Sequence, residues 1–116
     1  MTLIIRRTVS AWLIIIGIVL SGPAAMAADG KILTPPVRVS EHLYAWIGPH
    51  GGPNPQNKGF RMNMGFVVGK NAVAVIEAGY YEPMAREMLQ HIAKITRAPV
   101  KYVINTNSQA DRFLGN

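Results

Sequence analysis

Three oxygen-bearing side chains alternate near the carboxyl end of the chain, as ligands around a metal ion do. In the segment VINTNSQADRFLGN, residues 103–116, they are Asn107, Gln109 and Asp111. The apolar residues before them predict a buried strand that runs into a polar turn. Zinc prefers imidazole, thiolate or carboxylate ligands, and calcium, which accepts amide oxygens, needs several more of them. One carboxylate and two amides therefore do not make a tight metal site.

Each of these residues also has a purely structural interpretation. Ser108 and Asp111 have the spacing of a capping box at the start of a helix, a carboxylate variant of the usual pattern. Asn107 and Gln109 are common in polar turns. Arg112 is always protonated and cannot be a ligand, so it either orients an anionic group of a substrate or lies in solvent.

Two apolar runs upstream predict the strands of a hairpin. Residues 62–69 and 72–77 flank a short turn at Gly69-Lys70-Asn71. The second run is apolar on both faces, which predicts a strand in the interior of a sandwich. Farther upstream, residues 37–48 predict one or two short strands, and the glycine- and proline-rich residues 49–59 predict a loop.

A helix and a further strand follow the hairpin. Apolar residues recur at helical spacing after Glu82-Pro83, and Arg97-Ala98-Pro99 ends the pattern. Residues 100–105 are the next strand. A crossover of this length favours parallel pairing with the helix on one face of the sheet. The carboxyl ends of the two strands then converge, which brings Glu77 close to the turn at Thr106.

The amino terminus has the three parts of a secretory signal peptide. Arg6-Arg7 supply positive charge, residues 11–20 are apolar, and Ala25-Met26-Ala27 predict cleavage after Ala27. The apolar run is short for a membrane span, although an uncleaved anchor is the alternative. Twin-arginine export is a second alternative to the general secretory route. We expect a periplasmic or secreted protein that meets the membrane only through this peptide.

Composition limits the remaining functions. The chain of 116 residues is long enough for one small domain and carries a formal net charge of +6. Its basic residues are scattered and form no run that could follow a phosphate backbone, so we expect no nucleic-acid partner. It contains no cysteine, which excludes a thiolate nucleophile and thiolate metal ligands.

The order of these segments resembles the N-terminal half of a metallo-β-lactamase-fold hydrolase, an α/β protein with an αββα sandwich. The matching stretches are NMGFVVG, AVAVIEAG, ITRAPVKYVINT and the final GN. They are most similar to the exported branch of the superfamily associated with sulfur oxidation and quinoproteins. We therefore divide the chain into a signal peptide at 1–27, a linker at 28–36 and, as the resemblance implies, a truncated half-domain at 37–116.

The resemblance also implies a metal motif, written T-H-x-H-x-D-H, in which histidines hold zinc and a metal-bound hydroxide attacks a carbonyl or ester. Thr106 and Asp111 match it, and Asp111 is the implied catalytic and metal-binding carboxylate. Asn107, Gln109 and Arg112 occupy histidine positions. Arginine after the aspartate resembles true metallo-β-lactamases, and asparagine at the first position resembles their single-zinc subclass. Gln109 departs from both.

The family pattern assigns roles to two residues outside this motif. Glu77 stands where the motif V-I-D-x-G has an aspartate that, with Thr106, supports the metal loop from behind the ligands. His50 lies in the loop that resembles a flap over the substrate, although a lone loop histidine is also commonly solvent-exposed.

Three hypotheses follow for function. The first is a zinc-dependent hydrolase of an unknown small molecule, with its site completed by residues beyond this chain. The second is a pseudoenzyme that keeps the fold, has lost the metal and binds a ligand or partner. The third is a truncated product of an interrupted gene that does not fold.

Overall fold

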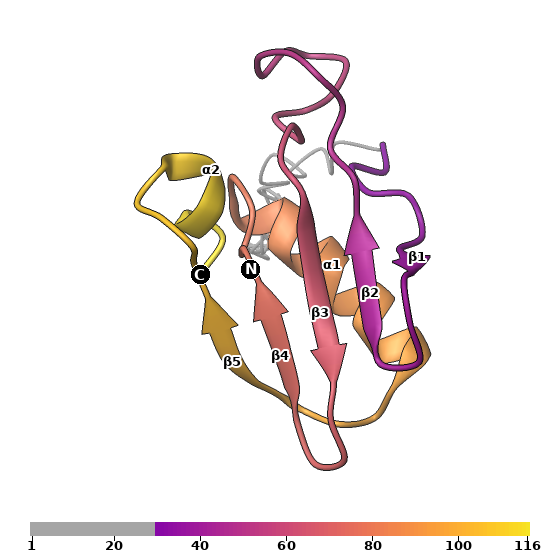
Figure 1. The fold of residues 1–116 in the computed structure, drawn as a ribbon. Helices are drawn as coiled ribbons and strands as arrows, with labels where there is room; N and C mark the ends of the chain where they lie inside the picture. The colour runs from indigo at the N-terminus through magenta and orange to yellow at the C-terminus, as the bar shows by residue number, and fades with distance from the viewer. Residues whose placement is uncertain (1–29) are drawn as a thin grey trace, which may run out of the picture.

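A five-stranded mixed sheet with one long helix against it forms the framework of the chain (Figure 1). This computed structural model describes residues 30–116, so the predicted signal peptide lies outside the described residues. The strands lie side by side in chain order. The first three pairs are antiparallel and the last is parallel. The strands are β1 (Val37–Arg38), β2 (Leu43–Trp46), β3 (Met64–Val68), β4 (Val73–Ile76) and β5 (Val100–Ile104).

The predicted hairpin is confirmed as β3 and β4. Val68 pairs with Val73, and the amide of Gly69 donates to the carbonyl of Ala72 at 2.8 Å to close the turn. The α/β class, the short strands before the hairpin and the loop at residues 49–59 are confirmed as well. The sheet and helix are shared by several α/β architectures, so they do not by themselves define the αββα sandwich.

Helix α1 (Glu82–Ile95) makes the crossover from β4 to β5, as predicted. Pro83 lies in its first turn, where its missing amide hydrogen costs little. Arg86 Nε donates to Glu82 Oε1 at 2.7 Å, one turn apart on the exposed face. The helix ends at Thr96, whose extended backbone and hydroxyl bond to the amide of Ala98 lead the chain into β5.

The core lies between α1 and one face of the sheet. Met84, Met88 and Ile92 line the inner side of the helix at helical spacing, as predicted. Ile95 and Leu89 belong to the same apolar pattern but are exposed, because they lie outside the stripe that touches the sheet. The sheet contributes Trp46, Met64, Phe66, Val73 and Val75 to this core.

The opposite face of the sheet is apolar and open. Side chains alternate between faces along each strand, so the cross-strand pairs place one continuous apolar set opposite α1. Among residues 30–116, no second layer covers it, and in Figure 1 the helix passes behind the sheet while the front stays bare. This face comprises Val37, Leu43, Ala45, Gly65, Val67, Ala74, Ile76, Tyr102 and Ile104.

Two predictions about strand burial are therefore wrong for the described residues. β5 was expected to be buried, but it is an edge strand with a free side, and Tyr102, Val103 and Ile104 are all exposed. β4 was expected inside a sandwich, yet Ala74 and Ile76 are only half-buried because α1 covers a single face. An apolar strand is suited to burial on both faces, but its composition does not show whether another layer packs against each face.

The segment predicted to be a linker is packed against the domain where the structure describes it. Leu33 is a core residue with 1% of its surface exposed. The indole nitrogen of Trp46 donates to the carbonyl of Thr34 at 2.7 Å, and the amide of Ile32 donates to Glu87 Oε2 at 2.7 Å. Residues 32–34 are thus part of the fold rather than a free tether. Within the described part of the chain, no helix is long and apolar enough to cross a membrane.

Candidate functional site

The carboxyl ends of β4 and β5 are joined by Glu77 and Thr106. Glu77 is 2% exposed and has a φ of 66°, in the left-handed region that side chains rarely adopt. Its Oε1 accepts a hydrogen bond from the amide of Thr106 at 3.0 Å and a second, short one from the Thr106 hydroxyl. The two residues predicted to support the loop from behind therefore do lie together and fix where it leaves β5.

The loop after Thr106 leads into the short helix α2 (Ala110–Phe113), and its start corrects the capping prediction. The residue before the helix is Gln109 rather than Ser108, and no side chain caps the helix. Asn107 Oδ1 accepts a hydrogen bond from the amide of Gln109 at 2.9 Å, which is a local turn. Asp111 therefore does not take part in a helix cap. Asn107 acts as a turn residue, because its side-chain oxygen already accepts a hydrogen bond from the backbone.

The carboxylate of Asp111 is buried between two arginines. Its side chain is 8% exposed, with Oδ2 lying 3.5 Å from Arg61 Nε and Oδ1 lying 3.5 Å from Arg112 Nε. The sequence predicted Arg112 on the substrate side of the site, whereas the structure places it as one of two cationic partners of Asp111. The positive charge beside Asp111 therefore comes from guanidinium groups of the chain itself.

Arg61 is the residue of this site that the sequence analysis missed. It lies between the loop at residues 49–59 and β3, and is held there because its neighbour Met62 is buried in the core. The end of β2 passes so close that a side chain at Gly48 would lie 2.5 Å from the carbonyl carbon of Arg61. The only signal in the sequence was a basic residue beside predicted core residues, which does not single it out.

A cavity of about 240 Å³ opens beside the Asp111–Arg61 pair. Gln109 lines this cavity and is exposed. Within the described residues, its side chain makes no hydrogen bond with Asp111. Tyr80, which follows β4, also lines the cavity. The lining residues are Pro53, Arg61, Tyr80, Gln109, Ala110 and Asp111.

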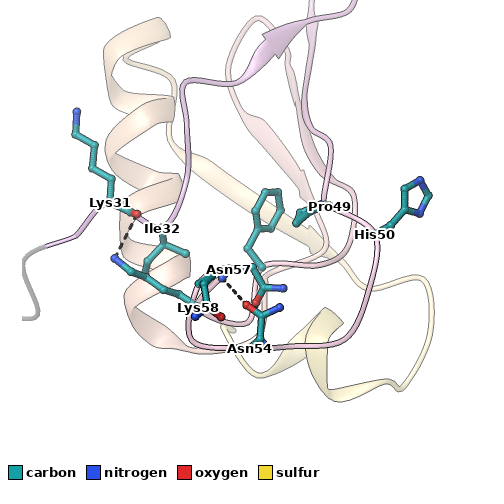
Figure 2. Close-up of a pocket in the computed structure, with 9 residues that line it drawn as sticks. Lys31, Ile32, Pro49, His50, Asn54, Asn57 and Lys58 are labelled. Carbon is teal, nitrogen blue, oxygen red and sulfur yellow. Dashed lines mark hydrogen bonds between the residues drawn. The ribbon is translucent and has the colours of Figure 1, made fainter.

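His50 does not join this cavity. It lies in a separate pocket of about 360 Å³ between the glycine- and proline-rich loop and Lys31–Ile32, where its ring points away from the other side chains (Figure 2). That loop is ordered by reciprocal bonds, from the amide of Asn54 to Asn57 Oδ1 at 3.0 Å and from the amide of Asn57 to Asn54 Oδ1 at 2.9 Å. The structure thus gives no contact between His50 and Asp111.

Several polar atoms near the strand ends are buried without a hydrogen-bond partner. They include both members of one ion pair, Asp111 Oδ1 and Arg112 Nε, which lie at a distance too long for a hydrogen bond. Such atoms are rare in folded proteins, where they accompany strain, a functional role, or a bound water or ion. The others are Glu77 Oε2 and Asn105 Oδ1.

The donor set does not fit the zinc that the family resemblance implies. Among the described residues, no three histidine, cysteine, aspartate or glutamate side chains gather in one place. Asp111 already faces two guanidinium groups, and Glu77 is engaged by Thr106. A cation placed at Asp111 would have to displace or repel two permanent positive charges.

No protein-family model matches the chain, and a comparison with curated proteins finds no match. What the site does is therefore inferred from its own residues.

Proposed function

We propose that this chain is an exported, metal-independent binding protein built on a metallo-β-lactamase-like fold. Its cavity beside Asp111 would hold a small molecule without hydrolysing it. The observation that carries the proposal is the pairing of buried Asp111 with Arg61 and Arg112 at 3.5 Å each. In the family that the sequence resembles, the same position serves a metal.

The chemistry of the site supports binding over hydrolysis. A metal ion lowers the pKa of bound water and so supplies hydroxide at neutral pH. Guanidinium groups remain protonated and have no open coordination position, so they orient anions but do not generate a nucleophile. Asp111 is held by two cations and has no histidine partner among the lining residues.

The family part of the proposal rests on two independent supports. The stretches NMGFVVG and AVAVIEAG form adjacent strands, and the strand of ITRAPVKYVINT lies parallel to the second of them. Glu77 and Thr106, matched to the family pattern by position, are also bonded to each other. The charged, apolar and small-residue parts of residues 1–27 support export.

A metal titration with a gain-of-function variant tests the proposal. Cobalt(II) and zinc(II) are titrated into the chain and into a variant carrying Asn107→His, Gln109→His and Arg112→His, which restores the family ligands. We expect no saturable metal binding by the unaltered chain and measurable binding by the variant. Tight zinc binding by the unaltered chain, together with zinc-dependent ester or lactam hydrolysis, would establish the hydrolase instead.

A further inference from the structure

We infer that the ligand of the Arg61 cavity is a small monocarboxylate. This inference deepens the proposed function and rests on it. It uses four properties of the site, namely the free hydrogen-bonding capacity of Arg61, the support that Asp111 gives it, the net charge of the cluster and the size of the cavity.

Arg61 presents an unused guanidinium fork. The closest approach of its side chain to Asp111 is from Nε, at 3.5 Å, which is too long for a hydrogen bond, and the side chain is 42% exposed. Among the hydrogen bonds of residues 30–116, none is donated by the Arg61 side chain. The two terminal nitrogens therefore remain available, and a guanidinium edge matches a carboxylate with two parallel hydrogen bonds.

Asp111 makes this a built site rather than a solvated arginine. Asp111 is buried and fixed on α2, where the carbonyl of Arg112 accepts a hydrogen bond from the amide of Ala78 at 2.7 Å. Its contact with Arg61 Nε restrains the long side chain before a ligand arrives. Such preorganisation lowers the entropy that binding must overcome.

The charge of the cluster selects a monoanion. Arg61 and Arg112 contribute two positive charges and Asp111 one negative charge, while the other lining residues are neutral. A single carboxylate neutralises the remaining positive charge. A dianion such as sulfate would leave excess negative charge next to buried Asp111, which a partly desolvated site disfavours.

The size and lining of the cavity limit the rest of the ligand. About 240 Å³ is small for a ligand pocket and suits a few heavy atoms beyond the carboxylate. Pro53 and Tyr80 offer apolar surface to a short aliphatic tail, and the Gln109 amide is a further neutral donor. Propanoate has these features and serves as the probe.

Equilibrium dialysis of the purified chain against radiolabelled propanoate tests the inference. We expect saturable binding at one site, weakened about tenfold or more by Arg61→Gln and several-fold by Arg61→Lys, which keeps the charge but loses the fork. Arg97→Gln makes the same change at an exposed arginine outside the cavity and should leave binding unaltered. Excess sulfate should compete poorly. Circular dichroism confirms that each variant keeps the fold.

Three outcomes would overturn the inference. They are the absence of saturable propanoate binding, equal weakening by Arg61→Gln and Arg97→Gln, and displacement by sulfate at the same concentration as by unlabelled propanoate. None of them bears on the metal titration above. A chain that binds neither propanoate nor zinc would therefore refute the monocarboxylate and leave the metal-independent site standing.

Discussion

Asp111 is the residue on which the chemistry of the site depends. The sequence singled it out as the carboxylate that follows the terminal turn, and in the structure it lies on α2 with partners from two parts of the chain. Arg112 is its neighbour in the chain, whereas Arg61 comes from the segment that leads into β3. An intact buried ion pair adds little to the stability of the fold. Removing one of its charges is costly, because the remaining charges are left unpaired in a poorly solvated site.

Asp111→Asn should therefore destabilise the fold. The substitution keeps the shape and leaves two guanidinium groups without an anion, with Arg112 only 24% exposed. We expect a loss of about 1–3 kcal/mol in the free energy of unfolding, measured by denaturant titration. The control is Glu82→Gln, which breaks an exposed pair with Arg86 and should cost about 0–0.5 kcal/mol. Equal losses in both variants would contradict the role assigned to Asp111.

Tyr81, at the start of α1, gives a prediction about alkaline stability. Burial, and secondarily the negative charge of Glu87, raises the pKa of the Tyr81 phenol above its ordinary value of 10.0. A raised folded-state pKa contributes stability that is present below pH 10 and lost as the pH rises through the folded-state value. Tyr81→Phe should therefore make stability fall less steeply above about pH 10.

The measurement is the free energy of unfolding as a function of pH from 8 to about 11.5, with Tyr102→Phe as a control on the exposed edge strand. An unchanged slope in Tyr81→Phe would show that the phenol has the same pKa in the folded and unfolded chain.

At the scale of elements, the joint between α2 and the end of β4 holds the site together. The amide of Ala78 donates to the carbonyl of Arg112 at 2.7 Å, and the amide of Gly115 donates to the carbonyl of Gly79 at 3.0 Å. Gly115 is required for this approach, since a Cβ there would lie 2.1 Å from the carbonyl oxygen of Ala78. The glycine thus allows α2 to bring Asp111 against Arg61.

Gly115→Ala should detach this joint while leaving the sheet and α1 intact. We expect faster hydrogen exchange at the amides of Ala78 and of residue 115, which donate the two bonds of the joint, a loss of about 1–3 kcal/mol in stability, and weaker propanoate binding. Gly52→Ala is the matched control, because nothing lies within 4 Å of its added methyl group. Exchange rates at Ala78 that match those of the control would contradict the docking role of Gly115.

The elements were largely predictable from the sequence, whereas their contacts were not. The hairpin, α1 and the parallel crossover follow from apolar periodicity and turn residues, which are local signals. Glu77 and Thr106 could be paired because both follow strands that converge. Arg61 could not, because its contact with Asp111 joins residues fifty positions apart in the sequence. The start of α2 was misplaced by one residue, which was enough to turn a predicted cap into an ion-paired carboxylate.

At the scale of the whole molecule, the open sheet face dominates solution behaviour. Val67, Tyr102 and Ile104 are 38%, 61% and 51% exposed on one apolar surface, and within residues 30–116 no strand pairs with the outer edge of β5. Continuous apolar patches and free strand edges promote association between molecules. We expect residues 28–116, expressed alone, to self-associate or to bind the dye ANS.

Substituting Val67→Thr together with Ile104→Thr should raise the fraction of monomer in analytical ultracentrifugation and reduce ANS fluorescence. Threonine keeps the strand propensity while removing apolar surface. Leu89→Gln removes a comparably exposed apolar side chain from α1 and should change association less. An unaltered chain that is fully monomeric and binds no ANS, or equal changes in the two sets of variants, would contradict the expectation.

The zinc content of the chain purified from cells grown in zinc-replete medium tests most directly whether the Asp111 site works without a metal. Inductively coupled plasma mass spectrometry on the unaltered chain, beside Asp111→Asn, gives the ratio of zinc to protein. Because Arg61 and Arg112 already neutralise the carboxylate, we predict the same trace amount of zinc in both proteins. Near-stoichiometric zinc in the unaltered chain, lost in Asp111→Asn, would contradict the account.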